Sequence, residues 1–509
     1  MPSTALQWFS LVAVILLQSI NGTNLNFPAY SSELKRILSL TQLQVNNLAF
    51  ANDAGKLAGW ISGIAALYLP LWLVLMIGLM LGLIGYGIPY LFLSHQNISL
   101  SYWQLFFLTV LAGNSICWIN TISYIVTIRN FPLQRQAAVG LTTSYISLSP
   151  VIYTAIVNAL SSLTFEKAEE YLLLNAVLPS IFGVIAMPFL REIDTGKAKQ
   201  QEAGFIAVSI ITIATGTYAI VSSLGSIASR LSPLINLIGI GLCLLAPIVV
   251  PLAECVRAIL KPNFCTSKEE DAKEADGAVE IANKEVESSP MVATMDEIGV
   301  KSMFKRLNFW LYFFVYFLGA TLGLVYLNNL GQIAQSRGFS HASSLVSFSS
   351  AFGFFGRLLP CFQHYIYSRS RRRVPGPASI MTMTVPISGA FFLLLNGTNV
   401  SLYMSTAIIG ACTGAITSVS VSVTTDLFGA KNFGVNHNVV VANIPIGSSV
   451  FGDLAALLYR RESHGHPTCM GLDCYRDTFI IWGCLSSLGS VLALILHLRS
   501  RKFYLDRLY

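Results

Sequence analysis

Ionisable side chains stand inside the long apolar runs of this sequence. Asp53 and Lys56 share one such run, and their spacing of three residues places them on the same face of a helix, where they can form an ion pair. A charge in an apolar span costs several kcal/mol unless it is paired or hydrated, so both residues are functional candidates. Asp53 would bind a proton or a cation, and Lys56 would hold an anionic solute. The alternative is a structural ion pair that gates two parts of the protein.

Two arginines and two further aspartates extend this set of proton-coupling or gating candidates. Arg357 lies inside an apolar run and keeps its charge, so it needs a carboxylate, carbonyl groups or water, and we expect Asp426 to be its partner. Arg129 ends another run, where its long side chain can simply reach the membrane surface. Asp453 is either a coupling acid or a residue that faces water or pairs near the outer end.

Asparagines form a second set, the candidates for contact with a translocated solute. Amides can hydrogen-bond a polar solute, and Gly22 and Pro28 loosen the first run around its asparagines. The alternative is hydrogen bonding between packed helices. Two interpretations of His437 also stay open: it is either a proton relay or a histidine at the membrane interface. The solute candidates are Asn21, Asn24, Asn114, Asn120, Asn328 and Asn329.

Cys469 and Cys474 lie in a short polar segment between the last two apolar runs. We expect a disulfide between them if that side faces an oxidising compartment. His464 and His466 leave a zinc site open as the alternative, although the ligand spacing is irregular.

Motifs of soluble catalysis are missing from the sequence. We find no phosphate-binding loop, no nucleophile elbow and no His-Glu-x-x-His metal motif, which argues against ATP-driven transport and against an enzyme. We therefore expect no cofactor and no bound metal. The net charge of +7 does not indicate nucleic acid, because the excess of basic residues lies in short loops between apolar runs.

The composition is that of a protein built from membrane-spanning helices. Of its 509 residues 54% are hydrophobic and only 11% are charged, against about 25% charged in soluble domains. A span needs roughly 20 apolar residues. The expected spans are residues 6–30, 47–69, 71–93, 102–127, 136–160, 171–190, 204–224, 232–256, 309–330, 342–366, 377–396, 400–425, 434–458 and 477–498.

Loop composition predicts the topology and the domains. Residues 268–297 hold ten acidic residues against three lysines, so we interpret residues 258–308 as a disordered linker. The bias of basic residues places this linker and both termini on the cytosolic side of the membrane. Whether this is the plasma membrane or an internal membrane stays open. Residues 5–20 have no basic flank or clear cleavage site, so they are expected to be a retained span. The predicted units are residues 1–200 (six spans), 201–257 (two additional spans), 258–308 (the linker) and 309–509 (six spans).

Two stretches give the sequence a resemblance to a known family. The first contains Leu48-Ala-Phe-Ala-Asn-Asp-Ala-Gly-Lys56 and, further on, Ile128-Arg-Asn-Phe-Pro132. The second contains Gly356-Arg357, Asp426-Leu-Phe-Gly429 and Cys469-Met-Gly-Leu-Asp-Cys474. Together they resemble the plant nodulin-like, nuclear-fusion-defective-type family of the major facilitator superfamily.

The resemblance implies an all-α membrane fold of two six-helix bundles, here with two extra central spans and about 12–14 in total. Many relatives carry a lysine where this chain has Thr143, which puts a shared specificity in doubt. Two such halves with a site between them are typical of a secondary transporter. We expect proton-coupled transport of a small polar or anionic solute. The alternative is a receptor or scaffold that acts through the linker, and the oligomeric state stays open.

Overall fold

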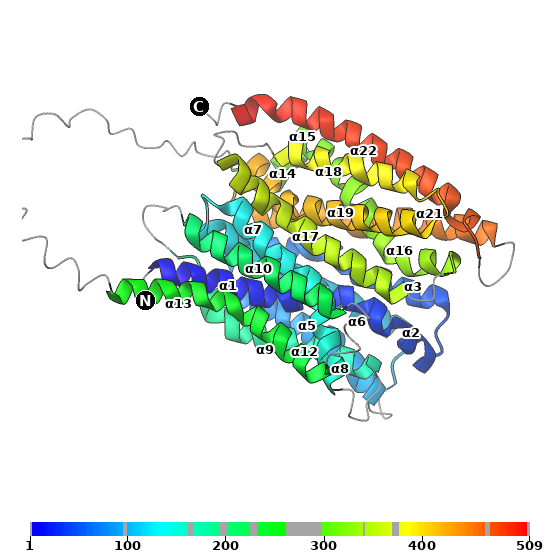
Figure 1. The fold of residues 1–509 in the computed structure, drawn as a ribbon, viewed down its shortest axis with the longest axis horizontal. Helices are drawn as coiled ribbons and strands as arrows, with labels where there is room; N and C mark the ends of the chain where they lie inside the picture. The colour runs from blue at the N-terminus through cyan, green and yellow to red at the C-terminus, as the bar shows by residue number, and fades with distance from the viewer. Residues whose placement is uncertain are drawn as a thin grey trace, which may run out of the picture.

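The structure is a computed structural model that describes residues 3–94, 99–160, 167–193, 201–223, 232–260, 297–338, 342–368, 376–463 and 469–505. Within these residues all regular secondary structure is helical (Figure 1). Among the described residues, twelve helical segments are long and apolar enough to cross a membrane. The predicted spans 47–69 and 342–366 are not among the twelve, but both are helical and both carry polar residues. Most of the predicted linker, residues 261–296, lies outside the described residues.

The N-terminal half (residues 3–193) has six helical passages, several of them broken by 3-10 turns. The break at Gly55–Ala58 separates two helices of one passage and places Lys56 in the turn. In chain order the helices are α1 (Ser3–Asn21), α2 (Phe27–Ile37), α3 (Gln42–Ala54), α4 (Gly59–Tyr68), α5 (Leu71–Ser94), α6 (Tyr102–Asn130), α7 (Arg135–Ser144), α8 (Ser149–Leu160) and α9 (Lys167–Ala186).

The C-terminal half (residues 297–505) repeats this arrangement, and an extra pair of passages precedes it. The extra pair consists of α10 (Glu202–Ser223) and of α12 (Pro233–Leu245) followed by α13 (Val249–Leu260). The C-terminal half consists of α14 (Val300–Phe304), α15 (Leu307–Tyr316), α16 (Leu322–Ser336), α17 (Ala342–Ser368), α18 (Gly376–Leu393), α19 (Asn399–Phe428), α20 (Phe433–Val441), α21 (Asn443–Glu462) and α22 (Asp473–Leu505).

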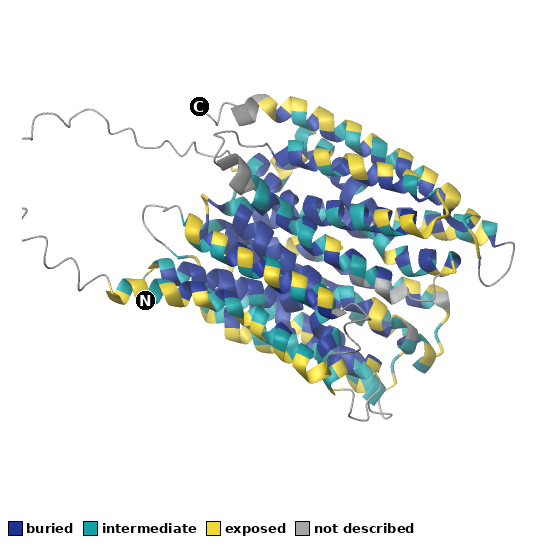
Figure 2. Cartoon of the chain, viewed as in Figure 1, coloured by how far each residue is buried: buried dark blue, intermediate teal, exposed yellow. Residues whose placement is uncertain are grey.

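The pattern of burial is the one expected of a protein that is surrounded by lipid. Large apolar side chains on the outside are exposed, as at Leu242, Ile259 and Leu457, while many serines, threonines and asparagines are buried (Figure 2). Hydrocarbon offers no hydrogen bonds, so polar groups are satisfied inside the bundle. The described chain is therefore a multi-pass integral membrane protein.

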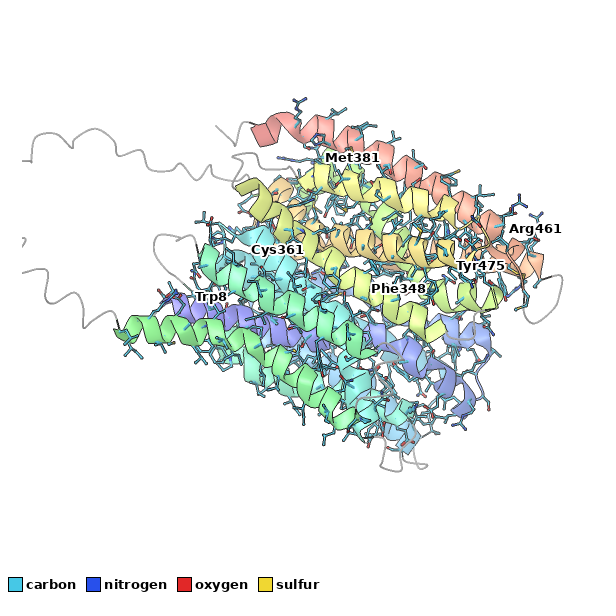
Figure 3. The ribbon with its side chains drawn as sticks, viewed as in Figure 1. Trp8, Phe348, Cys361, Met381, Arg461 and Tyr475 are labelled. Carbon is cyan, nitrogen blue, oxygen red and sulfur yellow. A yellow bond between two sulfur atoms is a disulfide. The ribbon has the colours of Figure 1, made fainter. Side chains whose placement is uncertain are left out.

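The two ends of the bundle differ. We call the end that contains Ser3, Leu260 and Leu505 the near end, and the opposite end, with Ile37 and Glu462, the far end (Figure 1). Trp8 and Arg461 mark the two ends in Figure 3.

Apolar contact between the halves is concentrated toward the near end. One hydrophobic cluster joins Leu141 and Tyr145 of the N-terminal half to Phe354 and Leu358 of α17. A second cluster joins Ile125 and neighbouring residues of α6 to Val421 and Phe433. Near the far end, by contrast, a separate cluster around Tyr30 and Tyr86 belongs to the N-terminal half alone.

One helix crossing occurs in both halves with the same contacts. In the N-terminal half α3 crosses α6 so closely that a Cβ on Gly55 would meet the carbonyl oxygen of Val110, and one on Gly113 would meet that of Asn52. In the C-terminal half α17 crosses α19 in the same way.

The equivalent contacts in the second crossing are Gly356 with Ala411 and Gly414 with Gly353. Each of these positions lies 301 residues after its counterpart, as Arg357 follows Lys56. The two halves are therefore structural repeats at this crossing, a pattern that is typical of facilitators with paired halves.

Replacing Gly113 with valine is expected to lower the free energy of unfolding, because the new side chain overlaps the Asn52 carbonyl oxygen. Overpacking of this kind costs about 1–3 kcal/mol. The measurement is the Tm of the purified protein in detergent micelles. Gly389→Val on α18 is the control, since among the described residues no atom outside the excluded neighbours lies within 4 Å of a Cβ there. Equal Tm values for the two variants would contradict the close crossing.

Candidate translocation site between the two halves

Asp53 and Lys56 form an ion pair at the break between α3 and α4. The helix α3 starts with a capping box in which Thr41 and Gln44 bond each other's backbone groups, and this fixes where the helix begins. Eleven residues later Asp53 stands in its last turn, and Lys56 Nζ lies 2.5 Å from Asp53 Oδ1. Both side chains are largely buried, so the pair is held in a low dielectric where it interacts strongly.

The second carboxylate oxygen of Asp53 is reached from the C-terminal half. Ser448 Oγ on α21 donates to Asp53 Oδ2 at 3.1 Å. Asn328 Nδ2 on α16 lies at 3.4 Å from the same oxygen, and Asn328 is itself exposed. One carboxylate therefore holds its own half's lysine and two groups of the other half, which makes the contact between the halves sensitive to its charge.

A second polar contact joins the halves where α4 and α6 meet α20. Asn438 Nδ2 donates to Thr121 Oγ1 at 2.8 Å and lies 3.3 Å from Ser62 Oγ. Beside it α4 and α20 approach so closely that a Cβ on Gly63 would meet the backbone of Gly434. This crossing closes the bundle on the near-end side of Asp53.

Arg135 and Asp426 form an ion pair across the halves at the near end. The expected partnership of Asp426 with Arg357 is thus not what the structure has, because α7 brings the Arg135 guanidinium to the end of α19. Arg129 pairs instead within its own half, with Glu192. Of these two ion pairs, only Arg135–Asp426 connects one half to the other.

Arg357 lies deep in the bundle without a carboxylate partner among the described residues. Its Nη1 donates to the backbone carbonyl of Thr143 on α7 at 3.4 Å, and its Nε is buried without a hydrogen bond. Close by, the Thr143 hydroxyl meets Ser418 Oγ of α19 at 3.0 Å, so this centre also joins the halves.

The N-terminal asparagine candidates mainly tie helices together. Asn21 Nδ2 donates to Asn120 Oδ1 at 2.9 Å, which links α1 to α6. Asn114 bonds the Gly55 carbonyl at 2.8 Å and accepts a hydrogen bond from Trp118. These contacts are the helix–helix bonds of the alternative interpretation, although Asn120 keeps some accessible surface.

The other polar candidates have different surroundings. Asn24 is partly exposed in the turn after α1, and Asn329 bonds the Val325 carbonyl of its own helix at 2.8 Å. His437 is buried, with Thr424 Oγ1 at 3.2 Å from Nδ1. Asp453 is exposed on α21 and accepts a hydrogen bond from Ser449. Asp453 thus lies away from the contacts between the halves.

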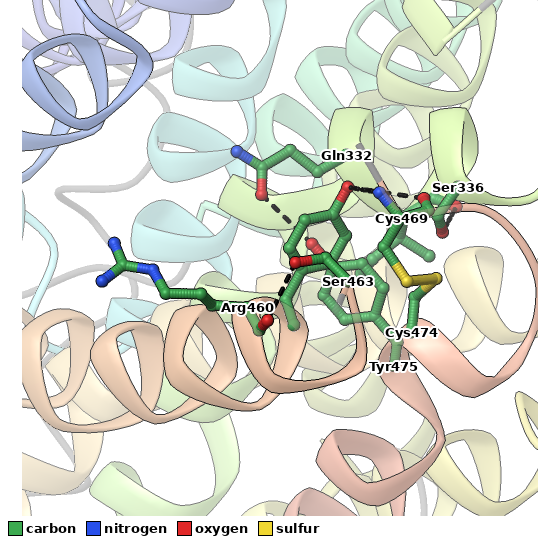
Figure 4. Close-up of a disulfide and its surroundings, with 9 residues drawn as sticks. Gln332, Ser336, Arg460, Ser463, Cys469, Cys474 and Tyr475 are labelled. Carbon is green, nitrogen blue, oxygen red and sulfur yellow. Dashed lines mark hydrogen bonds between the residues drawn. A yellow bond between two sulfur atoms is a disulfide. The ribbon is translucent and has the colours of Figure 1, made fainter. Parts of the chain in front are cut away.

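Cys469 and Cys474 form a disulfide at the far end (Figure 4). The loop that they close docks on the end of α16, where the Gly471 amide donates to the Ser336 carbonyl at 2.7 Å. Tyr475 Oη, next to the disulfide, donates to Gln332 at 3.1 Å. The loop thereby ties α21 and α22 to α16. His464 and His466 of the zinc alternative lie outside the described residues.

Next to this loop Arg337 caps the end of α16. It donates to the carbonyl groups of Leu394 and Asn396 and lies over the ring of Phe479 at 5.7 Å. Burial lowers the pKa of the Arg337 guanidinium from its ordinary value, since desolvation disfavours the charged form. An arginine nevertheless stays charged at neutral pH, so this is a structural anchor. No cluster of three metal-ligating side chains occurs in the part of the chain that the structure describes.

Some residues of the site escaped the sequence interpretation. Nothing in the sequence joined Ser448 to Asp53, or Asn438 to Thr121, because these partners lie in different halves of the chain.

Reversing the charge at Asp426 is expected to lower the Tm, because Asp426→Arg replaces the ion pair with two guanidinium groups that repel each other. Breaking a buried pair costs about 3 kcal/mol or more. The measurement is the Tm of the purified protein for Asp426→Arg, Arg135→Asp and the double variant. The double variant should recover much of the loss, and a strictly additive double loss would rule out a direct pair.

Comparison with known proteins identifies the family of this chain. The sequence matches the family described as Nodulin-like over residues 7–252 and the family described as NFD4, C-terminal domain, over residues 291–505. The chain is 36% identical over 531 residues to Protein NUCLEAR FUSION DEFECTIVE 4 of Arabidopsis thaliana, with 98% of this chain and 89% of that protein covered.

Solved transporter structures share the architecture at low identity. A double tryptophan mutant of XylE matches with a TM-score of 0.58 at 10% identity, covering 97% of this chain and 95% of that chain. The proton:xylose symporter XylE bound to 6-bromo-6-deoxy-D-glucose gives 0.56 at 12%, covering 96% and 95%. FucP in the outward conformation gives 0.53 at 10%, covering 96% and 98%. The chain therefore belongs to the nodulin-like family and has the major facilitator fold.

Proposed function

We propose that this protein is a secondary active transporter that moves a small polar or anionic solute by alternating access, coupled to protons. The two repeated halves, with polar contacts between them at several depths, support this proposal. XylE and FucP, which have the same fold, are described as proton symporters of xylose and fucose. That description is of those proteins, and here it supports the mechanism rather than the solute.

Alternating access needs two sets of contacts that form in turn. The Arg135–Asp426 pair and the α4–α20 crossing would hold the near end closed in the conformation described here. The contacts of Asp53 with Ser448 and Asn328 would hold the opposite side of the site. Both sets are formed in the conformation described here, so rocking of one half against the other would break one set and keep the other.

The shared carboxylate of Asp53 is the observation that carries the proton coupling. As an anion it accepts charge-assisted hydrogen bonds from Lys56 and from Ser448. Protonation would remove the negative charge, weaken both contacts and so favour separation of the halves on this side. Loss of the proton on the other side of the membrane would restore them. Proton binding and opening are thereby linked through one residue.

We further propose that the near end faces the cytosol, as the distribution of basic residues indicates. The far end would then lie in the cell exterior or in a secretory lumen, an oxidising compartment that suits the Cys469–Cys474 disulfide. Which membrane holds the protein is left to localisation experiments.

A cysteine-labelling experiment tests this orientation. In Arg461→Cys a new thiol stands on the exposed surface of the far end, and in Ser3→Cys a new thiol stands at the near end. In sealed microsomes with the cytosolic face outward, a maleimide–polyethylene glycol should modify Ser3→Cys at once but Arg461→Cys only after permeabilisation. The unsubstituted protein gives the background, and the opposite pattern would reverse the orientation.

Asp53→Asn is the variant that tests proton-coupled transport. Asparagine keeps the shape and can still bond Ser448, but it cannot bind and release a proton. Untargeted metabolite profiling compares cells with the native protein, with Asp53→Asn and with neither, at two external pH values. We expect a solute whose distribution depends on the native protein and on pH, and a loss of at least about tenfold in its flux in the variant, the effect of about 1.4 kcal/mol.

Asp473→Asn, on the exposed first turn of α22, is the matched control and should behave as the native protein. If no solute differs although the protein is present in the membrane, the transport proposal loses its support. A scaffold that acts through residues 258–308 would then be the better interpretation. If flux persists in Asp53→Asn with its pH dependence intact, coupling resides elsewhere.

A further inference from the structure

The repeated helix crossing places a cation at the same position in each half. Lys56 follows Gly55 at the crossing of α3 with α6, and Arg357 follows Gly356 at the crossing of α17 with α19. Asp53, three residues before Lys56, neutralises that lysine. The position that corresponds to Asp53 in the second half is occupied by Phe354, so the repeat supplies Arg357 with no acid.

Phe354 also shows why no acid is present there. Its ring is fully buried in the cluster between α7, α10 and α17, with the ring of Tyr145 at 6.3 Å and Gly216 of α10 directly against it. An aspartate at this position would lose that packing and gain a charge in apolar surroundings. The second repeat has thus kept the cation and replaced its neutralising partner by a packing residue.

Among the described residues, no acidic side chain compensates the positive charge of the Arg357 guanidinium. Arg357 donates one long hydrogen bond to the Thr143 carbonyl, and its Nε is buried without a partner. A carbonyl dipole solvates a cation but does not neutralise it. Such a group is stabilised strongly by an anion that arrives from outside the chain, since the Coulomb attraction is large in a low dielectric.

Part of the surface of Arg357 is accessible. The residue lies on α17 between Phe348 and Cys361, which Figure 3 labels. The nearby Thr143–Ser418 contact is one of those that join the halves. A ligand held by Arg357 would therefore bridge the two halves, as a transported solute must.

We propose that Arg357 binds the carboxylate of a small monoanionic solute. This inference rests on the proposed transport function and names its substrate class. A planar guanidinium matches a carboxylate through paired N–H···O bonds, and Arg357 has its Nε and further N–H groups to offer.

The charge count selects a monoanion over a dianion. While Asp53 is ionised it neutralises Lys56, and among the described residues Arg357 then contributes one uncompensated positive charge. A monocarboxylate balances that charge. A dicarboxylate or a phosphate dianion would leave a net negative charge in the same low dielectric, which is costly.

Ligand binding to the purified full-length protein in lipid nanodiscs tests the assignment. The probes are glycolate, its neutral isostere glycolamide, the dianion malonate and xylose, each followed by the Tm and by intrinsic tryptophan fluorescence. We expect glycolate to bind at least about tenfold more tightly than glycolamide, in line with a charge-assisted pair. Malonate and xylose should bind more weakly than glycolate.

Three variants separate Arg357 from a general effect of charge. Arg357→Gln should abolish the preference of the protein for glycolate over glycolamide, and Arg357→Lys should retain part of it. Arg461→Gln, on the exposed end of α21, removes an equal charge from the surface and should leave the preference unchanged. If the native protein shows no preference for glycolate, or if Arg357→Gln keeps it, the assignment is overturned.

Uptake of labelled glycolate and xylose into proteoliposomes distinguishes this inference from the transport proposal. Glycolate uptake that Arg357→Gln abolishes supports both. Binding that depends on Arg357 without uptake of any probe would leave the anion site standing and contradict transport of this class. Xylose uptake that Arg357→Gln does not change would support transport and overturn the monocarboxylate site.

Discussion

The absence of water around the spans is the constraint on which the rest of this structure depends. Every polar group in hydrocarbon must find its partner within the protein. The exposed surface is therefore apolar, and the serines, threonines and asparagines turn inward. Once inside they lie between helices, and many of them lie between the two halves. The polar contacts that hold the halves together and the groups available to a solute are consequently drawn from the same set.

The two halves repeat a helix crossing, but they treat its cation differently. Glycines let α3 approach α6 and α17 approach α19 with almost no space between backbones. The residue after the glycine then projects from a fixed position, as Lys56 in one half and Arg357 in the other. Of the two, Lys56 alone has an acid three residues before it. The charge of Lys56 is therefore neutralised by Asp53, whereas Arg357 has only a carbonyl group as its hydrogen-bond partner. Under the proposed anion binding, this asymmetry decides which of the two repeated positions receives the negative charge of the solute.

The contacts between the halves also have different chemistry at different depths. Toward the near end they combine apolar clusters with the Arg135–Asp426 ion pair. At Asp53 the contact depends on one carboxylate that reaches both its own lysine and the opposite half. In the proposed mechanism, proton binding at Asp53 loosens this contact between the halves, whereas the apolar clusters at the near end do not depend on a proton.

The sequence by itself determined the features that depend on local composition and spacing. Apolar runs determine where helices span the membrane, and the spacing of Asp53 and Lys56 determines their pairing, because residues three apart on a helix are neighbours. It did not reveal the repeat, since the 301-residue relation rests on a few glycines whose importance appears only in the crossing helices. Nor did it identify the partner of Asp426: Arg135 is 291 residues away, and the choice between it and Arg357 depends on how α7 packs against α19. Tertiary structure alone decided that pairing, and with it the isolation of Arg357, because partners far apart in sequence are selected by helix packing rather than by any local pattern.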